Sequence, residues 1–151
     1  MGKILIVNTG PVKSGTDREL SPNAVAQAVS ERLSEYKVSA LYVCQLPGTD
    51  GMAQIIAERF GLQVQPWPGT GDAVAGALDD IAVKHKKETA VIVSQAALSV
   101  TMLLHLLHLD SKHYEQIAQD PGAVNLFEVR FGVPSALYIN DTCHLQSIPS
   151  L

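Results

Sequence analysis

The chain has 151 residues, with 11 lysines and arginines against 15 acidic residues, and a net charge of −4. This length predicts one domain, residues 1–151, that buries a core without disulfides or metals. No stretch concentrates enough positive charge to follow a phosphate backbone, which argues against nucleic acid as a partner, and no apolar run reaches the ~20 residues that span a bilayer. The composition therefore predicts a soluble, cytoplasmic protein that does not bind membranes.

The chain opens with a strand that carries polar residues to its end. Lys3 to Val7 is a continuous apolar run, typical of a strand buried on both faces of a sheet, and Asn8 and Thr9 follow it. In α/β folds, ligands bind at the carboxyl ends of the parallel strands. Asn8 and Thr9 therefore stand where such a fold would place a site.

Helices and strands alternate along the rest of the chain. Helical spacing and capping residues predict helices from Ser21 to about Tyr36, up to Phe60 before a Gly61 cap, from an Asp72 cap to about His85, from Ala96 through Leu107 and from near Ser111. Apolar and β-branched runs predict strands at Val38–Cys44, Leu62–Gln65, Thr89–Val93, Val124–Phe131 and Ser135–Ile139. The last two strands are close enough for a hairpin, so the sheet has a parallel centre and an antiparallel edge. The predicted fold class is α/β, with three layers (α/β/α) and a mainly parallel mixed sheet.

The order of these elements, together with several short motifs, resembles the histidine phosphatase superfamily, also called phosphoglycerate mutase-like. Family members open with a strand ending Arg-His-Gly, and this chain has Asn8-Thr9-Gly10 there. The third core strand of the family ends Ser-His-Gly, and this chain has Ser94-Gln95-Ala96. Further pairs match at the family's spacing: Leu20-Ser21, Gln27-Ala28, Ile56-Ala57, Gly61-Leu62, Asn140-Asp141 and His144-Leu145. The resemblance covers nearly the whole chain and implies a short, phosphohistidine-phosphatase-sized domain.

The resemblance also implies which positions would form the phosphate pocket. The family's two arginines, its nucleophilic histidine and its second histidine fall on Asn8, Gly48, Thr9 and Gln95, respectively. Neutral groups bind a phosphoryl group more weakly than arginine or imidazolium, and Thr9 offers a hydroxyl in place of an imidazole nucleophile. We therefore expect a degenerate family member, catalytically inactive, that acts as a binding or regulatory module for a protein partner or a small metabolite.

The predicted ligand-binding positions are those of this vestigial pocket and of the polar loop beside it. They are Asn8, Thr9, Gly10, Lys13, Arg18, Gly48, Ser94 and Gln95. No catalytic residue, metal ligand or cofactor is expected. The alternative is an enzyme of altered chemistry, a weak phosphatase or hydrolase of a small phosphorylated substrate that uses Thr9, Cys44 or Asp72.

Two further features leave alternatives open. Trp67, between prolines, either stacks on a ligand at the pocket rim or fills the vacated pocket, and an open pocket would favour a small-molecule ligand. His105, His108 and His113 lie near one helix, but their spacing and leucine neighbours favour a helix surface over a zinc site. A homodimer also stays open, because two-fold dimers are the commonest oligomers.

Overall fold

The computed structural model describes residues 2–10, 19–46, 48–69 and 71–151. Its strands are β1 (Gly2–Thr9), β2 (Val38–Val43), β3 (Val64–Pro66), β4 (Thr89–Gln95), β5 (Val124–Arg130) and β6 (Val133–Asp141). Its α-helices are α1 (Pro22–Leu33), α2 (Asp50–Phe60), α3 (Val74–Lys84) and α4 (Ala96–Leu106). Short 3₁₀ segments lie at Gly71–Ala73, Ser111–Gln116 and Cys143–Leu145.

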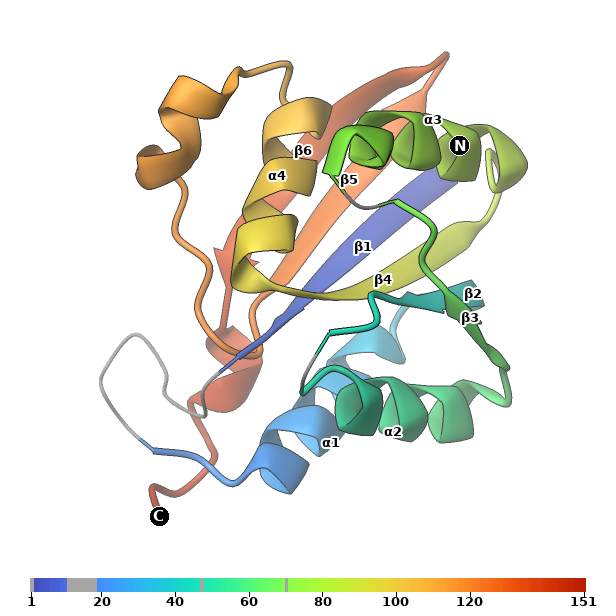
Figure 1. Cartoon of the computed structure of the whole chain (residues 1–151). Helices are drawn as coiled ribbons and strands as arrows, with labels where there is room; N and C mark the ends of the chain where they lie inside the picture. Colours follow the sequence, from blue (N-terminus) through green and yellow to red (C-terminus); the bar gives the residue numbers. More distant parts are fainter. Residues whose placement is uncertain (1, 11–18, 47, 70) are drawn as a thin grey trace.

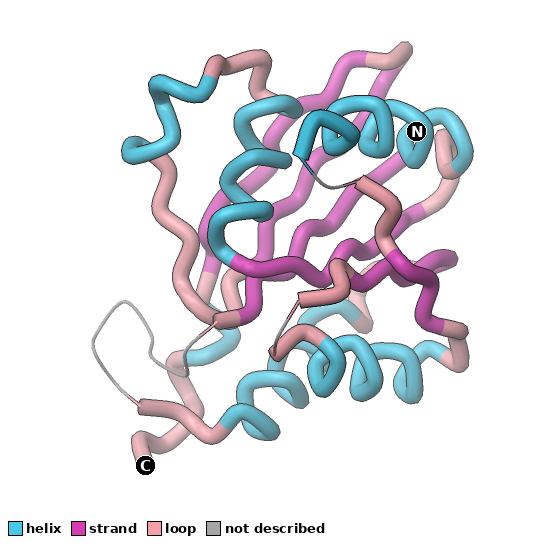
Figure 2. The backbone as a smooth tube through the Cα atoms, viewed as in Figure 1, coloured by secondary structure: helices cyan, strands magenta, loops and turns pink. Residues whose placement is uncertain are grey.

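The strands form a six-stranded sheet in the order β3-β2-β4-β1-β5-β6. The pairs among β1 to β4 are parallel, and β5 and β6 add antiparallel strands at one side. Helices α1 and α2 cover one face of the sheet, and α3 and α4 cover the other (Figures 1 and 2). The predicted α/β class, with three layers and a mixed sheet, is confirmed.

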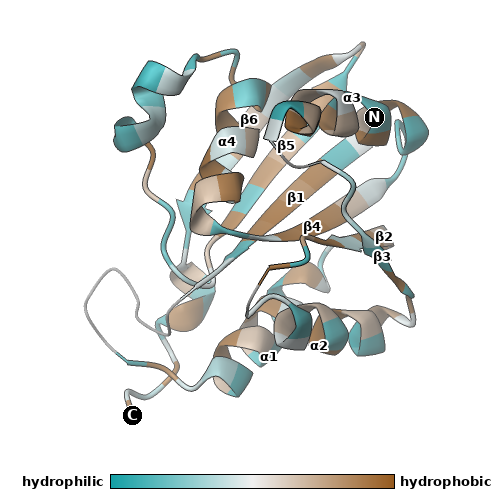
Figure 3. Cartoon of the chain, in the orientation of Figure 1, coloured by the Kyte–Doolittle hydropathy of each residue, from teal (hydrophilic) through white to brown (hydrophobic). Residues whose placement is uncertain are grey.

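Side chains of β1 alternate between the two faces of the sheet and so belong to two separate cores. Leu5 and Val7 pack with the apolar faces of α1 and α2, whereas Ile4 and Ile6 pack with those of α3 and α4. Figure 3 shows apolar residues along β1 and β4, and alternating apolar and polar residues along α1 and α2. Successive side chains of a strand point to opposite faces of the sheet. The side chain of Thr9 therefore lies on the α1/α2 face, and that of Asn8 lies on the α3/α4 face. This alternation decides which strand-end residues can share a pocket.

The helix ends follow the sequence signals closely. Pro22 occupies the first turn of α1, where the Ser21 hydroxyl oxygen accepts from the amide of Ala24. Helix α2 ends at Gly61, whose φ of 64° places it in the left-handed region predicted for a cap. Within the described part of the chain, no helix has the length and apolar character that crossing a bilayer requires.

Several boundaries differ from the prediction. Helix α1 ends at Leu33, three residues before Tyr36. Asp72 lies in a 3₁₀ turn and does not cap α3, which has no side-chain cap. The segment from Ser111 is also a 3₁₀ helix, and strand β4 runs on to Gln95 because it pairs with β1 as far as the last residue of that strand. The longer β4 sets its last residue beside the end of β1.

Candidate functional site

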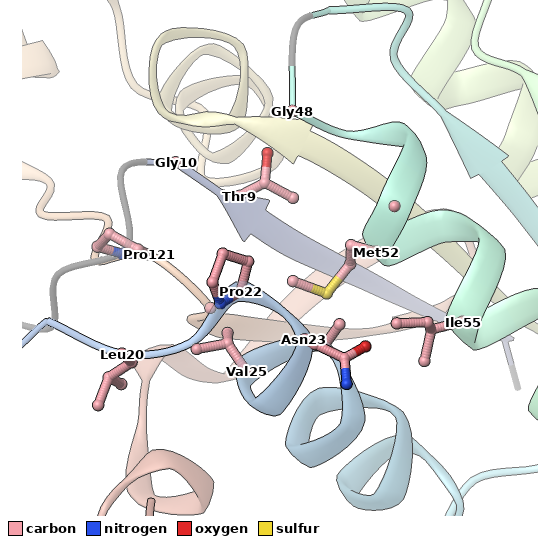
Figure 4. A pocket seen from close by; sticks show the side chains of 13 residues that line it. Thr9, Gly10, Leu20, Pro22, Asn23, Val25, Gly48, Met52, Ile55 and Pro121 are labelled. Carbon is pink, nitrogen blue, oxygen red and sulfur yellow. The ribbon is translucent and has the colours of Figure 1, made fainter. Parts of the chain in front are cut away.

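A pocket of about 240 Å³ opens at the carboxyl end of β1, beside the first turns of α1 and α2 (Figure 4). It is lined by Thr9, Gly10, Leu20, Pro22, Asn23, Val25, Ala26, Gly48, Gly51, Met52, Ile55, Pro121 and Gly122. In Figure 4, Met52 and Ile55 of α2 face Pro22 and Val25 of α1 across the pocket. The pocket is therefore open, on the α1/α2 side of the sheet, at the sheet edge where the sequence predicts a site.

Thr9 supplies the hydroxyl at the sheet end of this pocket. The side chain is buried, and its Oγ1 donates a hydrogen bond to the carbonyl oxygen of Ser94 at 2.9 Å. That bond leaves the lone pairs of the hydroxyl oxygen to accept from a ligand or a water. Thr9 therefore combines a fixed orientation with a remaining capacity to accept hydrogen bonds.

Gly48 and Gln95 lie beside Thr9. Gln95 is the register partner of Thr9 across the β1–β4 pair. Gly48 has a φ of 87°, and a Cβ built on it would lie 3.9 Å from Nε2 of Gln95. Three of the predicted positions therefore meet at one end of the pocket, although Gln95 is not among the residues that line it.

Asn8 points to the opposite face of the sheet from the pocket. Its Nδ2 donates to the carbonyl oxygens of Gln119 (3.3 Å) and Asp120 (3.0 Å), and its Oδ1 accepts from the Ser99 hydroxyl at 2.9 Å. The amide thus has three protein partners and is almost fully buried. Asn8 holds in place the loop that continues into Pro121, and so supports the pocket without lining it.

Of the remaining predicted positions, one lines the pocket, one lies behind it and two are not described. Gly10 lines the pocket, whereas Ser94 is fully buried on the α3/α4 side and contacts the pocket only through its carbonyl bond to Thr9. Lys13 and Arg18 lie outside the described residues. The structure therefore brings Thr9, Gly10 and Gly48 into the pocket wall.

Among the three residues proposed for altered chemistry, Thr9 alone lines the pocket. Cys44 is buried, and burial raises the pKa of its thiol to about 11, so the sulfur is protonated at neutral pH. Asp72 lies on an exposed 3₁₀ turn. Of these three residues, Thr9 is therefore the one placed to act on a ligand in the pocket.

Trp67 does not fill the pocket. It is buried in the core beneath α3, with its ring edge-on to Tyr42 at a centroid separation of 6.2 Å. Neither alternative for Trp67 holds, and the open pocket that would favour a small-molecule ligand is the one observed.

His144 supports the pocket from behind. Its Nε2 lies 2.8 Å from the carbonyl oxygen of Gly122, a lining residue, and its Nδ1 lies 3.0 Å from the Arg32 guanidinium, which also pairs with Asp141 at 2.9 Å. Because Arg32 can only donate, Nδ1 must accept, and the ring is the neutral tautomer with its proton on Nε2. Burial lowers the pKa of His144, which favours the same neutral form.

The histidines near α4 have other partners. His105 Nε2 lies 3.0 Å from a carboxylate oxygen of Asp79, and His113 Nδ1 lies 2.6 Å from Oε1 of Gln116. Among the residues that the structure describes, no three histidine, cysteine or acidic side chains are grouped as a metal ion would require.

The apolar lining was not foreseen from the sequence. It comes from the residue before the cap of α1, from the amino-terminal halves of α1 and α2, and from the segment before β5: Leu20, Pro22, Val25, Ala26, Met52, Ile55 and Pro121. A signal was present, because helices that follow parallel strands begin at the carboxyl edge of the sheet, and Ser21-Pro22 marked such a beginning. The sequence did not reveal the distance between the amino ends of α1 and α2, which leaves space for the pocket.

Solved structures share this fold over nearly the whole chain. A phosphoserine phosphatase from Entamoeba histolytica, in complex with 3-phosphoglyceric acid, matches with a TM-score of 0.78 at 21% identity, over 96% of this chain and 100% of that chain. YhfR from Bacillus stearothermophilus matches with a TM-score of 0.80 at 13% identity, over 97% and 100%. A mycobacterial glucosyl-3-phosphoglycerate phosphatase in complex with VO₃ matches with a TM-score of 0.70 at 14% identity, over 93% and 99%. No curated protein matches by sequence.

These comparisons contradict the prediction of a catalytically inactive binding or regulatory module. Two of the proteins that share this fold over nearly their whole length are phosphatases, which favours an enzyme and therefore the alternative of altered chemistry on a small phosphorylated substrate. The prediction was wrong because it considered only the loss of the family's arginines and histidines at the four pocket positions. The pocket itself is open, and the Thr9 hydroxyl lies in its wall.

A family model supports the same assignment from the sequence. Residues 70–142 match the model of the histidine phosphatase superfamily (branch 1). This segment contains α3 to β6 and includes β4, whose end lies beside Thr9. The fold of the rest of the chain agrees with it. Residues 70–142 are thus similar to the histidine phosphatase superfamily, and nearly the whole chain shares the fold of solved phosphatases.

Proposed function

We propose that the chain is a hydrolase of the phosphatase type that acts on a small phosphorylated substrate bound in the pocket at the end of β1. The observation that carries the proposal is the open pocket at the carboxyl end of the central strands, where α/β enzymes bind ligands. The phosphatases among the solved relatives support it. A cytoplasmic location, predicted from composition, is part of the proposal.

Helix α2 offers the phosphoryl group a favourable electrostatic environment. Its N-cap residue, Thr49, makes no capping bond to the helix, because its hydroxyl hydrogen-bonds to the carbonyl oxygens of Cys44 and Leu46 at 2.7 Å each. The first-turn amides of α2 therefore lack a side-chain acceptor from the cap, and Gly51 in that turn lines the pocket with open space where a Cβ would be. The amino end of a helix attracts anions through these amides and through its dipole.

In the proposed reaction, Thr9 orients the attacking water. Its proton is committed to the carbonyl oxygen of Ser94, so its oxygen accepts from the water, whose own oxygen attacks phosphorus. The phosphorus–oxygen bond to the leaving alcohol breaks, one proton of the water passes to the leaving oxygen and the other stays on the phosphate, and the products are inorganic phosphate and the free alcohol. The described lining residues include no ionisable side chain that could act as a base for Thr9 itself. Catalysis by positioning alone gives a slow enzyme, as expected for a weak phosphatase.

The test is phosphate release from p-nitrophenyl phosphate and a panel of other phosphomonoesters. Thr9→Val keeps the shape of the side chain and removes the hydroxyl, and we expect it to lower kcat at least ~10-fold, whereas Thr9→Ser retains most of the activity. Thr101→Val is the matched control, because the Thr101 hydroxyl bonds to its own helix, at the carbonyl of Ala97. Thermal shifts with phosphate and vanadate report binding separately. If the native chain releases phosphate no faster than the Thr9→Val variant, the proposal is contradicted.

A further inference from the structure

From the wall of the pocket we infer that the substrate's leaving group is apolar: an aryl group or a short branched alkyl group, rather than a sugar, an amino acid or a glycerate. The inference rests on the proposed function for the phosphoryl half of the ligand. For the other half it rests on the side chains that the pocket presents. Seven of them are apolar: Leu20, Pro22, Val25, Ala26, Met52, Ile55 and Pro121.

The apolar wall is a preformed continuation of the core. Leu20, Val25 and Met52 are buried members of the cluster between the sheet, α1 and α2, and Ile55 packs against the same cluster. Packed side chains of this kind keep their positions when no ligand is bound. A ligand that enters the pocket therefore meets an existing apolar surface.

Among the described lining residues, Thr9 and Asn23 are the ones with polar side chains. Thr9 lies at the sheet end, and the Asn23 amide belongs to the exposed first turn of α1. Water against the intervening wall has few hydrogen-bond partners, and an apolar group that displaces such water gains affinity. The two ends of the ligand thus meet different surroundings: the phosphoryl group at Thr9 and the leaving group at the wall.

Additional charge on the substrate would be left without a partner. None of the described lining residues is ionisable. A buried ammonium or carboxylate that is not paired is strongly unfavourable. These features select against phosphoserine-like and phosphoglycerate-like molecules.

The volume of the pocket fits one aromatic group. An apolar cavity of about 150 Å³ is sufficient to bind benzene. At about 240 Å³, this pocket holds a phenyl or a naphthyl group with its oxygen turned to Thr9. We therefore choose 1-naphthyl phosphate and its product, 1-naphthol, as probes.

Methionine methyl groups give a direct readout that does not require turnover. The chain has three methionines. Met52 lines the pocket, and Met102 is fully buried in the opposite core. With ¹³C-methyl methionine, we expect 1-naphthol to shift the Met52 methyl resonance in a saturable way and to leave that of Met102 in place. The Met52→Gln variant identifies the Met52 signal by its loss.

Turnover gives the second readout. We expect kcat/KM for 1-naphthyl phosphate to exceed that for phosphoserine and 3-phosphoglycerate by about 100-fold. Met52→Gln, which places an amide in the wall, raises KM for 1-naphthyl phosphate about tenfold, and Met52→Leu restores most of the loss. The control is Val83→Gln, a similar polar replacement at an exposed position on α3, which leaves KM unchanged.

The outcomes separate the two proposals. Naphthol binding at Met52 with no hydrolysis of any phosphomonoester supports the apolar leaving-group site and rejects the phosphatase. Faster hydrolysis of phosphoserine or 3-phosphoglycerate than of 1-naphthyl phosphate supports the phosphatase and overturns the inference. An unshifted Met52 methyl at saturating 1-naphthol also overturns it.

Discussion

The hydroxyl of Thr9 donates to the carbonyl oxygen of Ser94, 2.9 Å away, and this bond joins the ends of β1 and β4 beside the pocket. The two strands are parallel and already paired through their backbones, so the side-chain bond adds a link from Thr9 to the residue before its register partner, Gln95. A carbonyl at the end of a buried strand has few alternatives to this donor. The same hydroxyl therefore has a structural role and a proposed catalytic role.

These two roles predict a stability change in Thr9→Val that is separate from the loss of activity. Valine fills the same volume but leaves the Ser94 carbonyl without its donor, and we expect the free energy of unfolding to fall by about 1 kcal/mol. Urea denaturation measures the change. Thr9→Ser, which keeps the donor, should lose less than Thr9→Val, and the reverse order would contradict this role.

Asn8 is predicted to matter for stability far more than for ligand binding. Asn8→Ala leaves the carbonyls of Gln119 and Asp120 and the hydroxyl of Ser99 without their partner, at a cost of about 2–3 kcal/mol. Ser99→Ala removes one of these bonds and should cost about 1 kcal/mol. The check is urea denaturation of both variants. An Asn8→Ala protein as stable as the native chain would show that the loop is held by other contacts.

The strand pattern allowed the sheet and the strand ends that border the pocket to be predicted, because both depend on local signals. Apolar runs that end in polar residues mark buried strands and their carboxyl ends, and Gln95 was found in this way next to Thr9. The separation of Asn8 from Thr9 was also present in the sequence, since adjacent residues of a strand point to opposite faces. Grouping both residues in one pocket neglected that alternation.

The apolar lining depends on packing between distant segments, and no local signal carries it. The distance between α1 and α2, which decides whether Met52 leaves space beside Val25, follows from all the side chains between the two helices and the sheet. The hydrogen bond from His144 to the Gly122 carbonyl likewise joins residues that are 22 positions apart. The resemblance to a family located Gly48 but did not reveal what surrounds it.

Two glycines of the pocket are predicted to respond to alanine in opposite directions. Gly48 has a φ of 87°, which a residue with a Cβ adopts only with strain, so Gly48→Ala should destabilise by about 1 kcal/mol. Gly51 lies inside α2 with no neighbouring atom within 4 Å of the place that a Cβ would take, and Gly51→Ala should stabilise by about 0.5–1 kcal/mol. Thermal unfolding of the two variants provides the comparison. Equal shifts in Tm for Gly48→Ala and Gly51→Ala would contradict the explanation by backbone conformation.

His144 makes stability depend on pH. Its pKa is lowered in the folded chain, so the unfolded state binds more protons in the range below the ordinary histidine value of about 6.5. The stabilisation is therefore complete above that pH and declines as the pH falls below it. Protonation also places an N–H on Nδ1, against the Arg32 guanidinium, which can only donate.

The measurement is urea denaturation at pH 7.5 and at pH 5.5. His144→Gln is the matched variant, because glutamine can donate to Gly122 and accept from Arg32 without titrating. We expect the native chain to lose more stability than this variant between the two pH values. Asp141, whose pKa is held low by its bond to Arg32, contributes a further loss only at more acidic pH. Equal losses in both proteins would remove His144 as the cause.

The two cysteines are predicted to differ in reactivity because their environments differ. Cys44 is buried, its pKa is raised to about 11, and a thiol reagent meets neither an accessible sulfur nor a thiolate there at pH 7.5. Cys143 is exposed, and its sulfur lies 3.2 Å from the Arg32 guanidinium. Iodoacetamide should therefore label the native chain once, at Cys143, and label it at both cysteines in denaturant, as mass spectrometry of the peptides would show.

Cys44→Ser should retain phosphatase activity, since the chemistry is placed at Thr9. Rapid labelling of Cys44 in the native chain, together with loss of activity in Cys44→Ser, would transfer the catalytic role from Thr9 to the thiol.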